Sequence, residues 1–233
     1  MALREELREE LLQLIKHNKE GFSSGTPESK QINALIDELS CLTLYPNAIS
    51  YGDIYKGHWV GDYFNFGSAV GGDGAKNQGT GVTTSLRVFS MGRLPDIPAT
   101  HVSSALEIDP LKGIYNFYSS LKIGKQQIPS HHFTYGRFSK KEENLNRFFV
   151  EFDGFEIRPK NPSTSLQDYC KEIAVNDEDQ LQAVLSPSPK LWSDIVYMDD
   201  TLRIQLGQLG GHYIMVKTDL PMYSITHSEV HKD

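Results

Sequence analysis

A chain of 233 residues is long enough to bury a substantial core as one domain without disulfide bonds. Its net charge of −7 argues against a nucleic-acid partner, because contacts with phosphates require a basic surface. No apolar run is long enough to span a membrane, and no apolar signal segment follows Met1. We therefore expect a protein that is neither secreted nor transmembrane.

Residues 1–50 carry two helical patterns. Leucine and isoleucine recur at helical spacing over 2–18, and the opposite face carries charges of both signs. Thr26 is a candidate N-cap for a second helix, which has Pro27 in its first turn and runs to about Thr43. We expect a helical hairpin that packs on the rest of the protein. The mixed charges of the first helix do not favour a role at a membrane surface.

From residue 51 the pattern changes to short β-rich runs separated by turn residues. An antiparallel sheet of about eight strands can close into a barrel that holds a small ligand. We predict a mainly β fold, in which the hairpin and an antiparallel β-barrel over 51–233 form one structural unit. The predicted main strands are 54–66, 82–90, 101–108, 112–122, 128–138, 145–157, 194–205 and 211–218, with a possible short addition at 222–226.

Two connections between the predicted strands are long. The glycine-rich segment 67–81 matches neither a P-loop nor a dinucleotide-binding motif, so we interpret it as a flexible hairpin or a loop at the barrel mouth. The segment 159–193 begins and ends in proline-containing loops and holds a predicted helix near 165–174. We treat 159–193 as a helical insertion that could dock a partner protein.

The polar residues do not form a catalytic or metal-binding pattern. His131 and His132 are neighbours in a predicted strand, so their side chains point to opposite faces. The two cysteines, Cys41 and Cys170, are far apart and lack metal-ligand spacing. No Gly-x-Ser-x-Gly motif is present. We expect no metal, no cofactor and no enzymatic activity.

Aromatic residues alternate along several predicted strands and could line the barrel interior. Either Arg137 or Arg203 would contact the polar head of a ligand that enters. A packed aromatic core and an open cavity fit this pattern equally well, so the state of the interior stays undecided here. The predicted lining residues are Trp59, Tyr63, Tyr115, Phe117, Phe148, Val150 and Phe152.

Two stretches carry a family resemblance. One is the helical lead-in to Lys56-Gly57-His58-Trp59, and the other is the segment 196–217, with an acidic turn, Leu202-Arg203-Ile204 and then glycines. Together they resemble the plastid lipid-associated protein (PAP/fibrillin) family. Gly61-Asp62-Tyr63-Phe64 stands where many members have a Leu-x-Tyr-Thr run, so the chain resembles a diverged member. Because no transit peptide is expected at its N-terminus, it resembles a cyanobacterial-type rather than a plant member.

The resemblance implies a lipocalin-like barrel and a non-enzymatic role. Such a protein would bind, store or transport a lipid, prenylquinone or carotenoid, in the cytoplasm or at the surface of thylakoids or lipid droplets. The Gly-x-Trp of this stretch also resembles the lipocalin signature, in which an arginine from a late strand covers the tryptophan. For Trp59 the first candidate partner is Arg203 and the second is Arg137.

Two other roles remain open at this stage. One is a chaperone that resembles bilin lyases, which would need a polar cavity with basic groups for the pigment's propionates. The other is a scaffold that recruits an enzyme of lipid or quinone metabolism through the hairpin or through 159–193.

Overall fold

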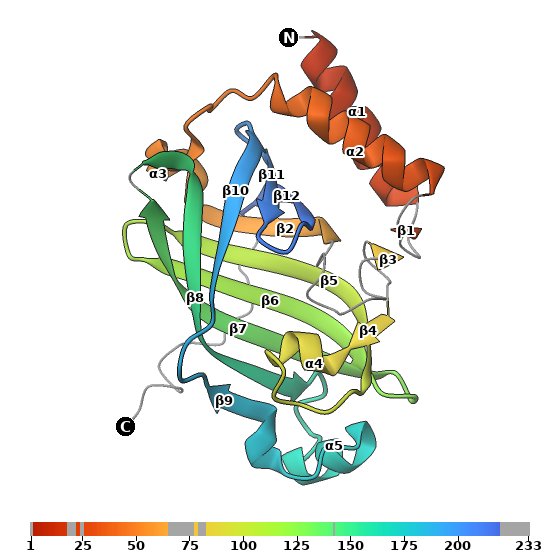
Figure 1. Ribbon diagram of the computed structural model, residues 1–233. Coiled ribbons are helices and arrows are strands. Elements are labelled where there is room, and N and C mark those ends of the chain that lie inside the picture. Colours follow the sequence, from red (N-terminus) through yellow and green to blue (C-terminus); the bar gives the residue numbers. More distant parts are fainter. Residues whose placement is uncertain are drawn as a thin grey trace.

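A computed structural model describes residues 2–17, 22–23, 26–64, 77–78, 83–141 and 143–219. Its centre is a closed antiparallel barrel of eight strands (Figure 1). Each barrel strand pairs with the next one along the chain, and the last pairs with the first, which confirms the predicted fold class. The barrel strands are β2 (Gly57–Phe64), β5 (Pro98–Asp109), β6 (Ile114–Ile123), β7 (Ile128–Lys141), β8 (Asn144–Pro159), β10 (Lys190–Met198), β11 (Leu202–Gly207) and β12 (His212–Thr218).

Two of the predicted strands are wrong. The segment 82–90 contains the short strand β4 (Thr83–Ser85), which pairs with β5, and then the helical turn α4 (Leu86–Phe89). The Ser85 hydroxyl accepts a hydrogen bond from the Arg87 amide at 3.1 Å and so caps that turn. The segment 194–205 spans two barrel strands, β10 and β11, rather than one. The predicted addition at 222–226 lies outside the described residues.

A β-bulge in β2 reverses which side chains point into the barrel. Met215 of β12 pairs with Gly61 and Ile214 pairs with Tyr63, so Asp62 is the extra residue. A regular strand would place Trp59 and Tyr63 on one face, because alternate residues share a face. After the bulge, Tyr63 instead packs outside the barrel, whereas Trp59 packs inside it.

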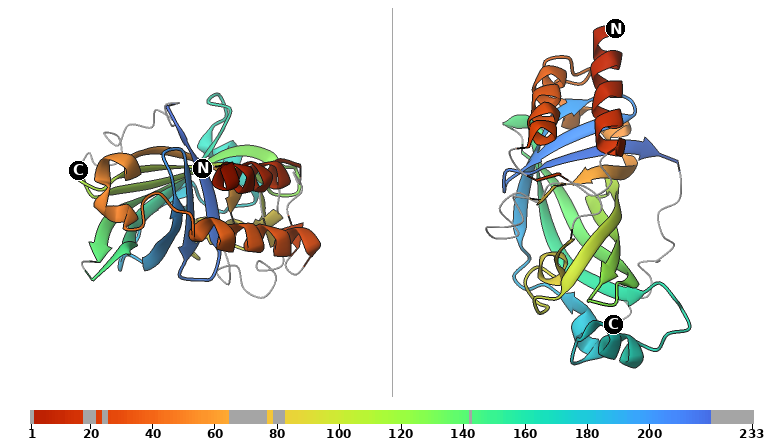
Figure 2. Two further views of the ribbon diagram at one scale, coloured as in Figure 1. Left: turned by 90° about the horizontal axis from the view of Figure 1, so that it is seen from above. Right: turned by 90° about the vertical axis from the view of Figure 1, so that its right-hand side faces the viewer.

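The two predicted N-terminal helices are present as α1 (Ala2–His17) and α2 (Pro27–Ser40). Thr26 caps α2 by accepting a hydrogen bond from the Ser29 amide at 3.3 Å. The helices lie side by side over the outer face of β10, β11, β12 and β2 (Figures 1 and 2). Among the described residues, no helix has both the length and the apolar character that crossing a bilayer requires. The apolar faces of the hairpin contact the barrel through Leu7, Leu11, Ile15, Ile32, Leu35, Ile36 and Leu39, against Tyr63, Tyr197, Leu202, Ile204 and Ile214.

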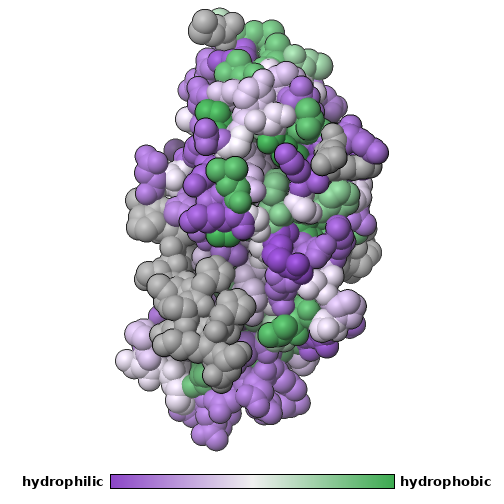
Figure 3. All heavy atoms as spheres, turned by 90° about the vertical axis from the view of Figure 1, so that its left-hand side faces the viewer, coloured by the Kyte–Doolittle hydropathy of each residue, from purple (hydrophilic) through white to green (hydrophobic). Residues whose placement is uncertain are grey.

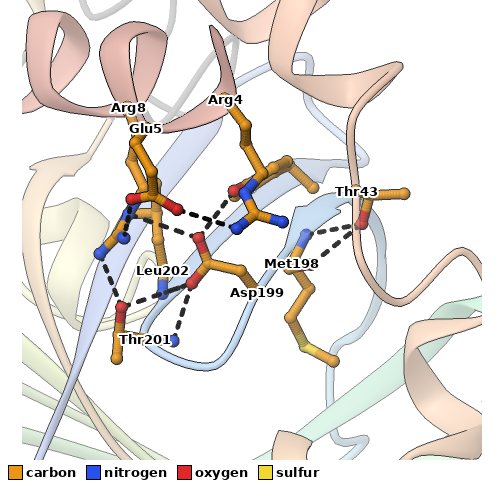
Figure 4. Close-up of polar contacts among 9 residues, drawn as sticks. Arg4, Glu5, Arg8, Thr43, Met198, Asp199, Thr201 and Leu202 are labelled. Atoms are coloured by element: carbon orange, nitrogen blue, oxygen red, sulfur yellow. Dashed lines mark hydrogen bonds and ion pairs between the residues drawn. The ribbon is translucent and has the colours of Figure 1, made fainter. Parts of the chain in front are cut away.

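The turn between β10 and β11 anchors the first helix (Figure 4). The buried Asp199 carboxylate accepts hydrogen bonds from the amides of Thr201 and Leu202 at 2.8 and 2.7 Å. Arg8 of α1 reaches the same turn, with Nε 3.3 Å from Asp199 Oδ2 and Nη2 2.6 Å from the Thr201 hydroxyl. One carboxylate therefore both shapes the turn and holds the helix on it.

Trp59 and Arg203 close one end of the barrel interior. Both side chains are fully buried, and the guanidinium carbon lies 4.6 Å from the centre of the Trp59 ring and 4.9 Å from that of Tyr55. The Trp59 indole donates to the Tyr55 carbonyl at 3.1 Å. The predicted contact between the tryptophan of β2 and an arginine of a late strand is confirmed. It fills this end of the barrel with a cation held between two aromatic rings.

The opposite end of the interior is closed by segments outside the ring of strands. The helix α5 (Leu166–Ile173) contributes Tyr169, Cys170 and Ile173 to a buried cluster that also contains residues of α4 and the inner face of β8. Tyr169 donates a hydrogen bond to Ser130 of β7 at 2.6 Å. The segment 159–193 thus contributes side chains to the barrel core.

We expect Trp59→Ala to lower the free energy of unfolding by about 3–5 kcal/mol, because it leaves a void beside the buried Arg203. Trp192 is the natural control, because it is only partly buried. Its replacement by alanine should cost about 1 kcal/mol, mainly through its contact with Arg147 at 3.8 Å. Urea unfolding of both variants measures the difference. Equal losses would contradict the role of Trp59 in closing the barrel.

Candidate functional site

A cavity of about 130 Å³ lies inside the barrel. Its walls include members of both packed ends, Phe89 and Phe152 from one cluster and Tyr115 and Val150 from the other. The interior is thus neither fully packed nor fully open. The lining residues are mainly apolar: Val88, Phe89, Met91, Tyr115, Phe117, His132, Thr134, Val150, Phe152, Leu191, Trp192, Ser193, Gln205, Gly207, Gln208, Leu209 and Tyr213.

Part of the cavity wall comes from α4 and the residue two positions beyond it. Val88, Phe89 and Met91 line the cavity, although the sequence pattern placed 82–90 in a strand of the barrel. Phe89 is almost fully buried, and its ring stacks at 6.3 Å on that of His101. A four-residue helix is too short to show helical periodicity, so the sequence gives no signal for this wall.

Four of the predicted ligand contacts line this cavity: Tyr115, Phe117, Val150 and Phe152. Three others lie in the packed end of the barrel outside the cavity wall. Phe148 stacks on Phe138 at 5.3 Å, and Trp59 holds Arg203 against its ring. Their burial leaves them as core residues.

The predicted interior positions of Tyr63 and Arg137 are wrong. The bulge in β2 puts Tyr63 under the helical hairpin. Arg137 lies opposite Glu151 in the β7–β8 ladder, on the face that alternates with Val150 and points outward. Its side chain is 62% exposed, 2.8 Å from Asp153 Oδ2 and 3.1 Å from Glu151 Oε2. The guanidinium therefore pairs with surface carboxylates and does not reach the cavity.

A group of polar side chains lies on the inner face of β5, β6 and β7. His101 hydrogen-bonds Ser104, whose hydroxyl is 2.9 Å from that of Ser119. His132 Nε2 is 2.7 Å from the Phe89 carbonyl and 2.8 Å from the Thr134 hydroxyl. Because a carbonyl oxygen can only accept, Nε2 must carry the proton of His132. His132 thus faces the cavity as a neutral imidazole of defined tautomer.

Burial keeps both interior histidines neutral. It lowers the pKa of His101 from 6.5 to about 4 and that of His132 from 6.5 to about 3. The bond to the Phe89 carbonyl opposes the shift of the His132 pKa, and His101 adds to it. Burial likewise raises the pKa of the Tyr115 and Tyr213 phenols. The titratable groups that line the cavity are therefore uncharged at neutral pH.

Gln205 extends the polar part of the wall on β11. Its side chain is buried, and Nε2 donates to the Tyr115 hydroxyl at 3.3 Å and to Ser193 Oγ at 3.5 Å. Gln205 lies two residues from Arg203 on the inner face of β11. Among the described lining residues none is Lys or Arg, so the cavity wall carries no cationic side chain.

The sequence of the chain matches one known protein family. The family model described as PAP_fibrillin matches residues 5–216. The chain belongs to the PAP/fibrillin family. Membership and the barrel fold are consistent with lipid-associated binding, and members of the family are generally structural, lipid-associated proteins. No curated protein matches the chain.

The placement of His, Cys, Asp and Glu side chains bears on metal binding and on nucleophilic chemistry. In the described parts of the chain, no three or more His, Cys, Asp or Glu side chains are grouped so as to hold a metal ion. Cys170 is buried in α5, and burial raises the pKa of its thiol, which disfavours the nucleophilic thiolate.

The buried histidines predict how stability depends on pH. The unfolded chain takes up a proton at each histidine near pH 6.5, whereas His101 and His132 stay neutral in the fold until about pH 4 and 3. Their contribution is therefore fully present above pH 6.5 and is lost as the pH falls. Each histidine should add up to about 1.4 kcal/mol per pH unit to the slope of the free energy of unfolding against pH. Urea unfolding between pH 7 and 5 should show a shallower slope for His132→Phe; an unchanged slope would contradict the neutral assignment.

Proposed function

We propose that this PAP/fibrillin protein binds, stores or transports a hydrophobic small molecule, a lipid, prenylquinone or carotenoid, without chemical reaction. The observation that carries the proposal is the apolar cavity inside the barrel, which is walled by Phe117, Phe152 and Val150. An apolar group that enters it leaves water and gains about 0.8 kcal/mol for each buried CH₂. The uncharged walls suit such a group, because they do not hold strongly hydrated side chains.

The size of the cavity limits how much of a ligand is enclosed. At about 130 Å³ it is comparable to an engineered cavity of about 150 Å³ that binds benzene. Sites that enclose a whole drug-sized ligand measure about 300–1,000 Å³. We therefore propose that one ring or a short apolar end enters the barrel, while the rest of a long ligand passes out through the opening.

The rim of the opening, formed by the exposed and partly exposed residues of the cavity wall, is mostly apolar, with Ser193 and Gln208 as polar members. Val88, Met91 and Trp192 are partly exposed, and Leu209, in the turn between β11 and β12, is 36% exposed. On the face shown in Figure 3, hydrophobic residues form small separate patches among hydrophilic ones. An apolar rim supports direct uptake of the ligand from a lipid phase. We propose peripheral contact with thylakoid or lipid-droplet surfaces at this rim.

The other two roles receive less support. A bilin would bring two propionates, and the described cavity wall offers them neither Lys nor Arg. A docking role for 159–193 would have to use its exposed side chains, because Tyr169, Ile173 and Leu181 are buried in the barrel core.

Filling the cavity should abolish binding. We expect cis-parinaric acid, a fluorescent polyene fatty acid, to gain fluorescence on titration with the wild-type protein. Val150→Trp places a large ring in the cavity and should weaken this binding at least tenfold. Val102, 38% exposed on β5, provides the matched control, and Val102→Trp should bind like the wild type.

Circular dichroism and thermal melting establish that both variants fold. Equal binding by the two variants would place the ligand outside the cavity. No binding by the wild-type protein, with this probe or with a quinone or carotenoid, would overturn the proposed function.

A further inference from the structure

One buried nitrogen in the cavity wall has no hydrogen-bond partner. His132 is 3% exposed, and its Nε2 is occupied by the Phe89 carbonyl and the Thr134 hydroxyl. Its Nδ1 has no partner in the described part of the chain. Since Nε2 carries the proton, Nδ1 presents a lone pair and can only accept. A buried acceptor without a donor is costly, and native structures rarely leave one.

A second buried acceptor, on another residue that lines the cavity, also has no hydrogen-bond partner. Gln205 Oε1 is buried without a partner among the described residues, while Nε2 of the same amide is used by Tyr115 and Ser193. Both residues line the cavity. Two residues of the cavity wall therefore hold buried acceptors without a donor, and a group that reaches either atom has to bring one.

We propose that the cavity selects an apolar ligand whose buried end carries a hydroxyl group, and that His132 Nδ1 accepts the hydrogen bond from that hydroxyl. This inference rests on the proposed function and adds the chemical class of the ligand head. A phenol, a hydroquinone or an alcohol meets the requirement. A quinone or ketone carbonyl would set an acceptor against Nδ1, so the structure favours the reduced, hydroxylated form of a quinone ligand.

The other ring nitrogen of His132 is already used, because its N–H is directed at the Phe89 carbonyl and the Thr134 hydroxyl. The neutral state of His132 at pH 7, produced by burial, keeps Nδ1 an acceptor under ordinary conditions.

The test compares ligands that differ in the donor alone. The probes are 4-nonylphenol and two analogues that lack a hydrogen-bond donor. The methyl ether of 4-nonylphenol is larger than the phenol at the buried end, and nonylbenzene is smaller. Titration of the wild-type protein by calorimetry should show the phenol binding about tenfold more tightly than either analogue, as one hydrogen bond to a buried acceptor provides. His132→Phe should reduce that preference to less than twofold.

The neighbouring residue supplies the matched control variant. His131→Phe makes the same substitution one position along β7, on the outward face, and should keep the tenfold preference. Nitrogen NMR of the wild-type protein gives a measurement that does not depend on the folding of a variant. The Nδ1 resonance of His132 should shift when 4-nonylphenol is added and stay unchanged with the methyl ether.

The outcomes separate this inference from the proposed function. If all three probes bind equally well to the wild-type protein and the Nδ1 resonance does not move, water satisfies the acceptors and the inference is wrong, while the apolar site stands. If none of the probes binds, both the inference and the proposed function fail. A preference that survives in His132→Phe would assign the recognition to another residue and would also overturn the inference.

Discussion

The buried guanidinium of Arg203 is the constraint on which the barrel depends. A cation without a carboxylate partner is costly inside a protein, and among the described residues Arg203 forms no ion pair. Its favourable contacts are the rings of Trp59 and Tyr55 and the Met215 sulfur, 3.2 Å from Nη2. These contacts join the first strand, the segment before it and two late strands. The charge is thereby held in the closed end and kept out of the cavity wall.

With one end closed around Arg203, the function of the barrel depends on how its other end is filled. The helices α4 and α5 pack in the cluster at this end, and Trp59 packs in the cluster at the other end. The cavity is lined by members of both clusters. Phe89 serves twice, because its ring packs in the wall and its carbonyl fixes the proton on His132. The result is an apolar, uncharged space with a few hydrogen-bonding atoms, as expected for a site that binds an apolar molecule by one polar end.

Much of the fold could be predicted because it rests on local patterns. Helical periodicity and the Thr26 cap indicated the hairpin, and Gly57-x-Trp59 with a late arginine indicated the closed end. The lining of the cavity depended on features without a local signal. An extra residue at Asp62 turned Tyr63 outward, and the alternation of Leu86 and Val88 is typical of a strand although α4 is helical. The bond from His132 to Phe89 joins residues 43 positions apart, so the unpartnered acceptor could not be inferred from sequence.

The central claim is that the barrel cavity holds an apolar molecule or the apolar end of one. Native mass spectrometry of the protein purified from its own host, followed by extraction and identification of bound molecules, tests it most directly. The account predicts one apolar molecule per chain in the wild-type protein and none in a variant whose cavity is filled. A wild-type protein that carries no molecule and takes up none from host lipid extract would contradict it.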